Sequence, residues 1–384
     1  MESRENKPAE KAASRGDGRR EIVSLTILRA FASWWVVIYH FRKMSPYTSG
    51  LDIFVLNFGW VGVDIFFVLS GFVLAYVYGP SIEGQNFDFW QFLVKRFARI
   101  YPVHLLTLAL TVAIATALLA VNPKASLAAQ LFANSGTGYD PVRTILAQLL
   151  LIHAWGVEKI GHFNAPSWSI SAEWFAYLFF PVVAYAILRL SRTAAVATGI
   201  IVFLLFNAFA LAWLGVPLAG LNENFGILRI MPEFCLGIAA FMLFRTVRIR
   251  RHWALLLLLA AVSGFYLQYL FGNGLWLIAP LAFFLVLCVS WLDAFLPQDA
   301  KVTRLLRYLG EISYSTYMVH TIVLILIWPL FTRFGARGWQ VQSLLFVLAG
   351  LMVAAASSAL YHWVEIPARN WISAHAPRIS RTRN

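Results

Sequence analysis

Apolar stretches of about twenty residues recur along most of this 384-residue chain, and they constrain its fold more than any other feature. A stretch of that length crosses the hydrocarbon core of a bilayer as an α-helix. Of all residues, 60% are hydrophobic and only 13% are charged. Strands that alternate polar and apolar residues are absent, so helices must satisfy the buried backbone. We therefore predict an all-α, polytopic integral membrane protein.

Eleven apolar segments are candidates for membrane crossings. They cover residues 25–42, 57–79, 100–121, 143–156, 170–189, 195–214, 226–245, 253–270, 275–296, 311–331 and 342–364. Segment 143–156 is short for a crossing, which takes about 20 residues. The distribution of Lys and Arg decides whether it crosses, because these residues are enriched in cytoplasmic loops.

The basic residues favour ten transmembrane helices. With a cytoplasmic N-terminus and no crossing at 143–156, 22 of the 31 Lys and Arg residues face the cytoplasm and 7 face outward. A crossing there would move the cluster from Arg245 to Arg251 outside. We predict that both termini are cytoplasmic and that 143–156 is re-entrant or lies at the outer surface. The last two basic residues, Arg29 and Arg229, lie inside predicted spans, where charges are costly and usually functional or paired.

The chain divides into three predicted parts: a disordered basic cytoplasmic tail (1–24), a transmembrane domain (25–365) and a second basic cytoplasmic tail (366–384). We attribute the net charge of +13 to topology signals and to attraction toward anionic lipid headgroups. Nucleic acid is not an expected partner, since no basic stripe lies on a soluble domain. Cys235 and Cys288 lie in apolar spans and are interpreted as small core residues, so neither a disulfide nor a metal site is expected.

Arg29 and His40 share the first apolar segment. Eleven positions apart, they fall within about 20° of each other on a helix and roughly 16 Å apart along its axis. The predicted topology puts Arg29 toward the cytoplasm and His40 toward the outside. Either the two residues line a transmembrane tunnel, or Arg29 pairs with a lipid phosphate and His40 satisfies a core hydrogen bond.

Further polar residues gather in the predicted outer half of the bundle. Asp64 either orients a histidine or neutralises Arg229, and Glu173 either orients His40 or binds sugar hydroxyls. Trp168 either stacks on a sugar or belongs to the interfacial belt of aromatic residues. Arg229 and Glu233, at positions i and i+4, either bind substrate or form a local ion pair, which is the simpler interpretation.

Arg96 and Arg99 lie in the predicted inner half, three positions apart on one helical face at the membrane surface. Guanidinium pairs suit phosphate groups, although cytoplasmic anchoring also explains them. His320 lies in the middle of a later span and is a candidate for substrate binding. The division predicts a site with two sides, which an anionic donor enters from the cytoplasm and a polar acceptor enters from outside.

The motifs resemble acyltransferase family 3, the membrane-bound acyltransferases that modify bacterial surface and exported glycans. The landmarks are the spacing from Arg29 to His40 and the runs VGVDIFFVLSGF, KRFARIYP, SWSISAEW, EISYSTYMVH and VEIPAR, in the expected order from about Leu25 to Arg369. The resemblance implies ten helices in a bacterial cytoplasmic membrane, acetyl-coenzyme A (acetyl-CoA) as cytoplasmic donor and a carbohydrate acceptor, either a polysaccharide or a lipid-linked oligosaccharide. It also implies that His40 is essential and that Arg96 and Arg99 contact the donor phosphates.

The expected reaction is therefore O-acylation with His40 as general base, by direct transfer or through an acyl-imidazole. In this scheme Glu173 or Asp64 holds the imidazole tautomer. Succinyl or another acyl group could replace acetyl. A transporter or flippase for polysaccharide precursors is the main alternative, because many helices with charges inside the membrane suit it too. A structural subunit of an assembly machine is the third possibility.

Overall fold

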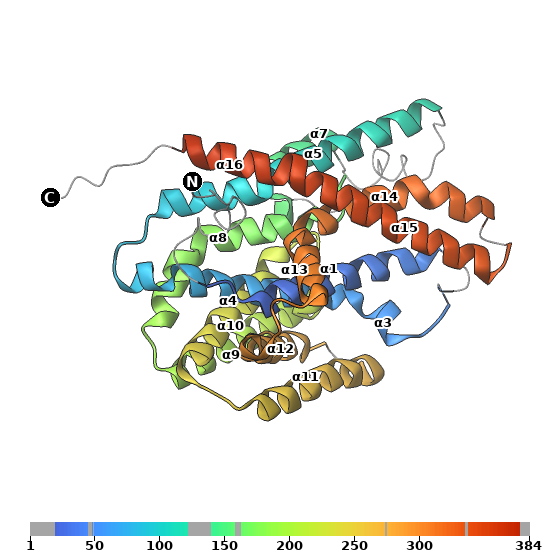
Figure 1. The fold of residues 1–384 in the computed structure, drawn as a ribbon. Helices are drawn as coiled ribbons and strands as arrows, with labels where there is room; N and C mark the ends of the chain where they lie inside the picture. Colours follow the sequence, from blue (N-terminus) through green and yellow to red (C-terminus); the bar gives the residue numbers. More distant parts are fainter. Residues whose placement is uncertain are drawn as a thin grey trace, which may run out of the picture.

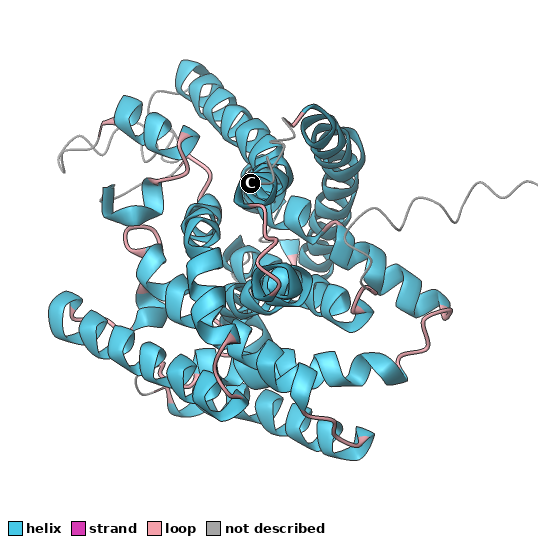
Figure 2. Cartoon of the chain, turned by 90° about the vertical axis from the view of Figure 1, so that its left-hand side faces the viewer, coloured by secondary structure: helices cyan, strands magenta, loops and turns pink. Residues whose placement is uncertain are grey.

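The computed structural model describes residues 20–44, 48, 50–121, 140–157, 163–272, 275–334 and 337–376. In this part of the chain the secondary structure is helical and contains no strand, which confirms the all-α prediction (Figure 2). The tails at 1–19 and 377–384 lie outside the described residues. So do Lys124 and Lys159, two of the basic residues expected on the outer side.

The helices are as follows. The first half contains α1 (Val23–Phe41), α3 (Phe54–Asn57), α4 (Gly62–Glu83), α5 (Phe89–Val121), α7 (Pro141–Leu149), α8 (Ser167–Leu188) and α9 (Arg192–Phe209). The second half contains α10 (Gly226–Thr246), α11 (Arg251–Phe271), α12 (Ile278–Leu292), α13 (Lys301–Glu311), α14 (Ser313–Phe334), α15 (Trp339–Leu360) and α16 (Ile366–His375). Short helical turns extend several of them, such as Gly59–Val61 before α4.

Ten helical segments of the described chain are long and apolar enough to cross a membrane. They are Val23–Met44, Gly59–Glu83, Phe89–Leu118, Ser167–Leu188, Arg192–Leu214, Gly226–Thr246, Arg251–Phe271, Ile278–Phe295, Ser313–Phe334 and Trp339–His375. This confirms the predicted number of crossings and a multi-pass membrane protein. Because ten is even, Val23 and His375 lie on the same side of the membrane if every segment crosses.

Segment 143–156 is not among the ten crossings. It forms α7 and a turn at His153–Val157 whose central residues have non-helical dihedral angles, and it packs against α5 and α8. The Tyr101 hydroxyl donates to the Leu149 carbonyl (3.0 Å), and the Ser171 hydroxyl donates to the Leu151 carbonyl (2.7 Å). These bonds satisfy carbonyl groups at the end of a short helix, which have no partner within it.

Two boundaries differ from the sequence prediction. The third span was expected to begin near residue 100, but α5 begins at Phe89, so Arg96 and Arg99 lie within the helix instead of at its start. The first turns of α5 were missed in the hydropathy pattern because Lys95 and the two arginines make them polar. At the other end, residues 366–375 form α16, which continues the last span into the expected C-terminal tail.

The centre of the bundle is the crossing of α4 and α10. A Cβ atom at Gly71 would overlap the Phe234 carbonyl, and one at Gly237 would overlap the Val68 carbonyl. The two backbones therefore approach closely, as small residues permit in membrane helices. In Figure 1 the helices α9, α11 and α12 lie below this crossing, and α5, α14, α15 and α16 lie above it. The polar residues discussed below come mainly from α1, α4, α5, α8, α10 and α14.

Candidate active site

A first cavity, of about 320 Å³, lies beside the N-terminal half of α1. We call it the arginine cavity, because Arg20, Arg29, Arg96 and Arg99 line it. Glu21 and Glu173 are the two acidic residues of its wall, so basic groups predominate. The rest of the lining is mostly apolar or aromatic and comes from α1, α4, α5, α8 and α14. Such a cavity suits a ligand with an anionic part and a slender apolar part.

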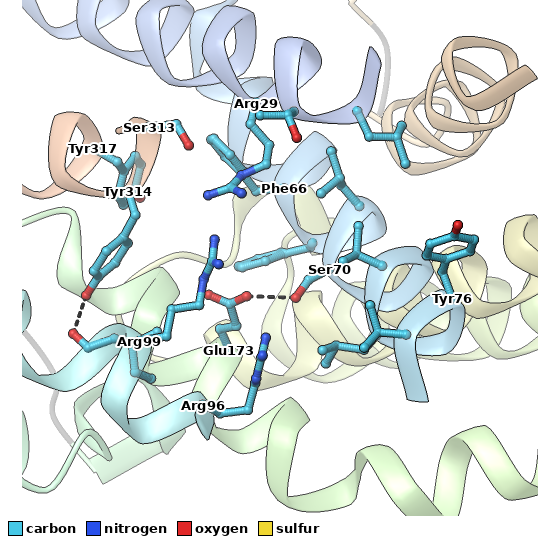
Figure 3. Close-up of a pocket in the computed structure, with 18 of the residues that line it drawn as sticks. Arg29, Phe66, Ser70, Tyr76, Arg96, Arg99, Glu173, Ser313, Tyr314 and Tyr317 are labelled. Atoms are coloured by element: carbon cyan, nitrogen blue, oxygen red, sulfur yellow. Dashed lines mark hydrogen bonds between the residues drawn. The ribbon is translucent and has the colours of Figure 1, made fainter. Parts of the chain in front are cut away.

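The guanidinium groups of Arg29, Arg96 and Arg99 point into this cavity from opposite walls (Figure 3). Arg29 extends from α1, and the other two extend from α5. All three are half-buried. Arg96 donates to the Tyr78 hydroxyl at 3.4 Å, and its Nε is buried without a hydrogen-bond partner in the described part of the chain. The structure thus brings together the three residues predicted for the inner half, with donor groups left for an anion.

Glu173 also lies in the arginine cavity, which corrects the sequence prediction. It was expected in the outer half beside His40, but its Oε1 accepts a hydrogen bond from the Ser70 hydroxyl at 2.7 Å (Figure 3). The same oxygen accepts a second hydrogen bond from the Tyr177 hydroxyl at 2.6 Å. The reason is depth. Six residues after the start of α8 at Ser167, Glu173 lies about 9 Å along the helix axis. The interpretation in which Glu173 orients His40 is therefore wrong.

A second cavity, of about 340 Å³, lies beside the C-terminal half of α1. We call it the histidine cavity, because His40 lines it. Its wall also contains two tryptophans, Trp60 and Trp168, and the loop residues Asn222 and Glu223 before α10. Desolvation at this wall raises the pKa of the Glu223 carboxyl above its ordinary value. Aromatic faces and hydrogen-bonding groups in one cavity suit a hydroxylated ring.

Arg229 connects the histidine cavity to a buried ion cluster. Its Nε and Nη2 donate to the two carboxylate oxygens of Asp64 at 3.0 and 2.7 Å, and its Nη1 donates to Asn222 Oδ1 at 2.6 Å. Glu233 is farther away, with Oε1 3.8 Å from Nε. Arg229, Asp64 and Glu233 are each at most 1% exposed. Of the two interpretations of Asp64, neutralisation of Arg229 holds, and orientation of a histidine is wrong.

Two of the residues predicted to bind substrate line neither of the two cavities. Glu233 and His320 are buried and belong to neither wall, as far as the described residues form it. Trp168 and Arg229 do line the histidine cavity, and the Arg229 guanidinium lies 5.5 Å from the Trp168 ring centre. Glu233 lies one helical turn after Arg229 on α10, and its carboxylate lies in the same buried ion cluster, with Oε1 3.8 Å from Nε of Arg229.

His320 packs directly against His40. The ring centres are 5.0 Å apart, and Nε2 of His320 lies 3.2 Å from Nδ1 of His40. No spacing rule could have predicted this contact, because 280 positions separate the two residues. The run SYSTYMVH could have indicated only that His320 lies in a buried polar environment. Its many hydroxyl groups lie in a span and are buried against neighbouring helices.

The two cavities approach each other inside the bundle. Val63 on α4 and Tyr317 on α14 line both of them. Arg29 and His40 lie on one uninterrupted helix, α1. Arg29 lines the arginine cavity and His40 lines the histidine cavity. The ring of His40 is thus not turned toward lipid. Val63 and Tyr317 therefore lie between the arginine cavity and the histidine cavity.

Comparisons with known proteins show that this chain is similar to acyltransferases. The model of a family described as an acyltransferase domain matches residues 22–363. Acyltransferase MdmB of Streptomyces mycarofaciens is 31% identical, and the match covers 89% of each chain. The putative peptidoglycan O-acetyltransferase YrhL of Bacillus subtilis is 25% identical over 91% of this chain. The O-acetyltransferase OatA of Staphylococcus aureus is 21% identical, also over 91% of this chain.

The relatives differ in length. This chain matches 55% of YrhL and 57% of OatA, so it spans little more than half of either protein. No solved structure matches the chain.

Proposed function

Since this chain belongs to the acyltransferase family whose domain it matches over residues 22–363, we propose that it is a membrane O-acyltransferase that acts on a surface or exported polysaccharide. The acyl group, acetyl in the first instance, comes from cytoplasmic acyl-CoA and goes to a hydroxyl group of the glycan. A carbohydrate acceptor is supported by the name of YrhL, which refers to peptidoglycan. A lipid-linked oligosaccharide has the same hydroxyl chemistry and is included in the proposal.

One observation carries the proposal: a cavity rich in arginine and a cavity with a histidine lie along the same helix and share Val63 and Tyr317. Acyl-CoA combines phosphate groups with a long, slender pantetheine arm. In our proposal the phosphates bind Arg96 and Arg99, and the arm passes Arg29 so that the thioester reaches the shared wall. Guanidinium groups bind phosphate through charge-assisted hydrogen bonds, which are the stronger kind.

We assign the arginine cavity to the cytoplasmic side of a bacterial inner membrane. The beginnings of α1 and α5 and the end of α4 border it. Arg245, at the end of α10, pairs with Glu83 at the end of α4, so a further basic cluster of the chain lies at the same end of the bundle. Enrichment of basic residues on one side supports a cytoplasmic orientation for that side. Both termini are then cytoplasmic. In this proposal the chain consists of an N-terminal cytoplasmic tail, a transmembrane domain and a C-terminal cytoplasmic tail.

The reaction needs one base and no change of oxidation state. His40 takes the proton of the acceptor hydroxyl as its oxygen attacks the thioester carbonyl carbon. The C–S bond breaks when the tetrahedral intermediate collapses, and the proton passes from His40 to the departing thiolate. The products are a glycan ester and free coenzyme A. Trp60 and Trp168 offer aromatic faces on which the sugar ring of the acceptor stacks.

Membrane vesicles of both orientations test this function. Acetyl-CoA does not cross a bilayer, so vesicles with the cytoplasmic face outward should transfer radiolabelled acetyl from added donor to glycan as an alkali-labile ester. Vesicles of the opposite orientation should not. Equal labelling in both orientations would contradict a donor site on the cytoplasmic side. Movement of glycan precursor without any acetyl transfer would favour the transporter alternative.

Replacing the two arginines of α5 should weaken donor binding. We expect Arg96→Gln combined with Arg99→Gln to raise KM for acetyl-CoA by at least about 100-fold, because each of the two charged hydrogen bonds contributes about 1.5–3 kcal/mol and about 1.4 kcal/mol corresponds to tenfold. The kcat should change less. The measurement is initial rate against donor concentration in vesicles with the cytoplasmic face outward.

A shorter donor and a neighbouring lysine are the controls for this prediction. S-acetylpantetheine lacks the nucleotide phosphates, so its KM should be the same for the double variant and the wild type. Lys95→Gln removes a positive charge next to Arg96, but Lys95 does not line the arginine cavity. It should leave both KM values unchanged. An equal rise in KM for both donors would show that the arginines do not contact the phosphates.

A further inference from the structure

His320 is fully buried next to His40, and the proposed mechanism assigns it no role. It is 0% exposed, and its Nδ1 lies 2.6 Å from the backbone carbonyl oxygen of Tyr317. Its other nitrogen, Nε2, lies 3.2 Å from Nδ1 of His40. On His40, the same Nδ1 lies 3.0 Å from the Val36 carbonyl oxygen.

These three distances fix the hydrogen positions of both rings. A carbonyl oxygen only accepts hydrogen bonds, so Nδ1 of His320 must carry a hydrogen and donate to Tyr317. In a neutral imidazole the second nitrogen then has a lone pair, so Nε2 of His320 is an acceptor. Both groups that face Nδ1 of His40, the Val36 carbonyl and His320 Nε2, are therefore acceptors. Nδ1 of His40 must carry its hydrogen, and the lone pair of His40 lies on Nε2.

We propose that His320 is the positioning residue of the active site: it holds His40 in the tautomer in which Nε2 is the base, and it supports the charge that His40 acquires. This inference rests on the proposed function of His40. In proteases with a catalytic triad, a carboxylate does this for the histidine. Here the carboxylates of Asp64 and Glu173 are engaged elsewhere, with Arg229 and with Ser70 and Tyr177.

The proton balance of the step supports a pair of histidines. When Nε2 of His40 takes the hydroxyl proton, the two rings together gain one positive charge. The hydrogen on Nδ1 of His40 either stays there, donating to His320, or moves to Nε2 of His320. In the second case the charge reaches a ring whose Nδ1 already donates to a backbone carbonyl. In both cases the pair returns one proton to the thiolate of coenzyme A, and both rings regain their initial state.

Two substitutions of His320 separate this task from simple packing. His320→Leu fills the space but accepts no hydrogen bond, and we expect kcat to fall about 100-fold with KM for acetyl-CoA within threefold of wild type. His320→Gln places an amide oxygen near the position of Nε2, so kcat should be at least about tenfold higher than in His320→Leu. Thr316→Val, one turn earlier on α14, is the control for a changed buried polar residue and should retain wild-type kcat.

Nitrogen NMR of the wild-type enzyme in lipid bilayers tests the tautomer of His40 directly, and a variant is needed only to assign the signals. With ¹⁵N-labelled histidine, and His40→Ala to identify the signals, His40 should show a protonated Nδ1 and an unprotonated Nε2. The opposite tautomer would overturn the inference. So would a wild-type kcat in folded His320→Leu, or equal kcat in the Leu and Gln variants. Each of these results leaves the proposed O-acyltransferase activity intact, whereas activity in His40→Ala would remove the basis of both proposals.

Discussion

Replacing His40 by alanine is expected to lower kcat for acetyl transfer by about 1,000-fold, within the range that a general base contributes. His40 lines the histidine cavity next to the wall shared with the arginine cavity. Without the imidazole, no residue of this wall takes the hydroxyl proton in our mechanism. The side chain is half-buried at a cavity surface, so its loss should leave the amount of folded protein in the membrane close to wild type.

The measurement is single-turnover transfer of labelled acetyl to glycan, normalised to the amount of folded protein. His362→Ala is the matched control, because His362 is an exposed histidine that stacks on Tyr308 away from both cavities. Its kcat should equal that of wild type. Added imidazole should partly restore transfer in His40→Ala by entering the space of the missing ring. A His40→Ala enzyme with wild-type kcat would exclude His40 as the base.

The same assay without acceptor distinguishes the two chemical routes. If the hydroxyl attacks the thioester directly, labelled donor alone leaves no acetyl group on the protein. An acyl-imidazole route leaves label on wild-type protein, which hydroxylamine releases and which His40→Ala does not acquire. Nδ1 of His40 is engaged with Val36 and His320 in the structure, so on either route the reacting nitrogen is Nε2.

The crossings were predictable because hydropathy and loop charge are local properties of the chain. The lengths of the apolar segments and the Arg245–Arg251 cluster together decided against a crossing at 143–156, and the described part of the chain contains ten candidate spans without it. The placement of Arg29 and His40 on one stripe followed from helix geometry alone. The early start of α5 was missed because Lys95, Arg96 and Arg99 make its first turns polar, and window hydropathy cannot tell an arginine in a cavity from one in a loop.

The partners of the site residues were not predictable, because they depend on how distant helices meet. Asp64 had two open interpretations, and the choice of Arg229 as its partner depends on the close crossing of α4 and α10 at Gly71 and Gly237. His320 was predicted to bind substrate, because the sequence around a histidine in the middle of a span does not indicate which side chain that histidine contacts. Glu173 was placed on the wrong side of the site because the span was expected to begin at residue 170, whereas α8 begins at Ser167, so the depth of Glu173 was underestimated by almost one helical turn.

Breaking the buried ion cluster should be the most destabilising single change in the bundle. Asp64→Leu leaves Arg229 without its bidentate partner at a position that is 1% exposed, with Glu233 at 3.8 Å as the remaining carboxylate. Removing one partner of a buried pair costs about 3–5 kcal/mol, because the other charge stays buried without compensation. The measurement is unfolding in mixed detergent micelles, followed by the near-ultraviolet signal of the tryptophans.

Glu83→Gln is the matched control for Asp64→Leu. Glu83 also forms a bond with an arginine, Arg245, at 2.8 Å, but the two side chains are 37% and 30% exposed. Exposed pairs contribute at most about 1 kcal/mol, so this variant should unfold close to wild type. Similar losses in both variants would contradict the stabilising role of a buried, bidentate pair between Asp64 and Arg229.

A triple variant separates the stability of the cluster from its function. Asp64→Leu, Arg229→Met and Glu233→Leu together replace all three buried charges by apolar side chains, and such replacements often restore stability or raise it. Stability should therefore recover relative to Asp64→Leu alone. Because Arg229 lines the histidine cavity and donates to Asn222, KM for the glycan should nevertheless rise while KM for acetyl-CoA stays unchanged. Recovery of stability with unchanged KM for both substrates would mean that the cluster only holds α4 against α10, and that acceptor recognition depends on other residues of the cavity.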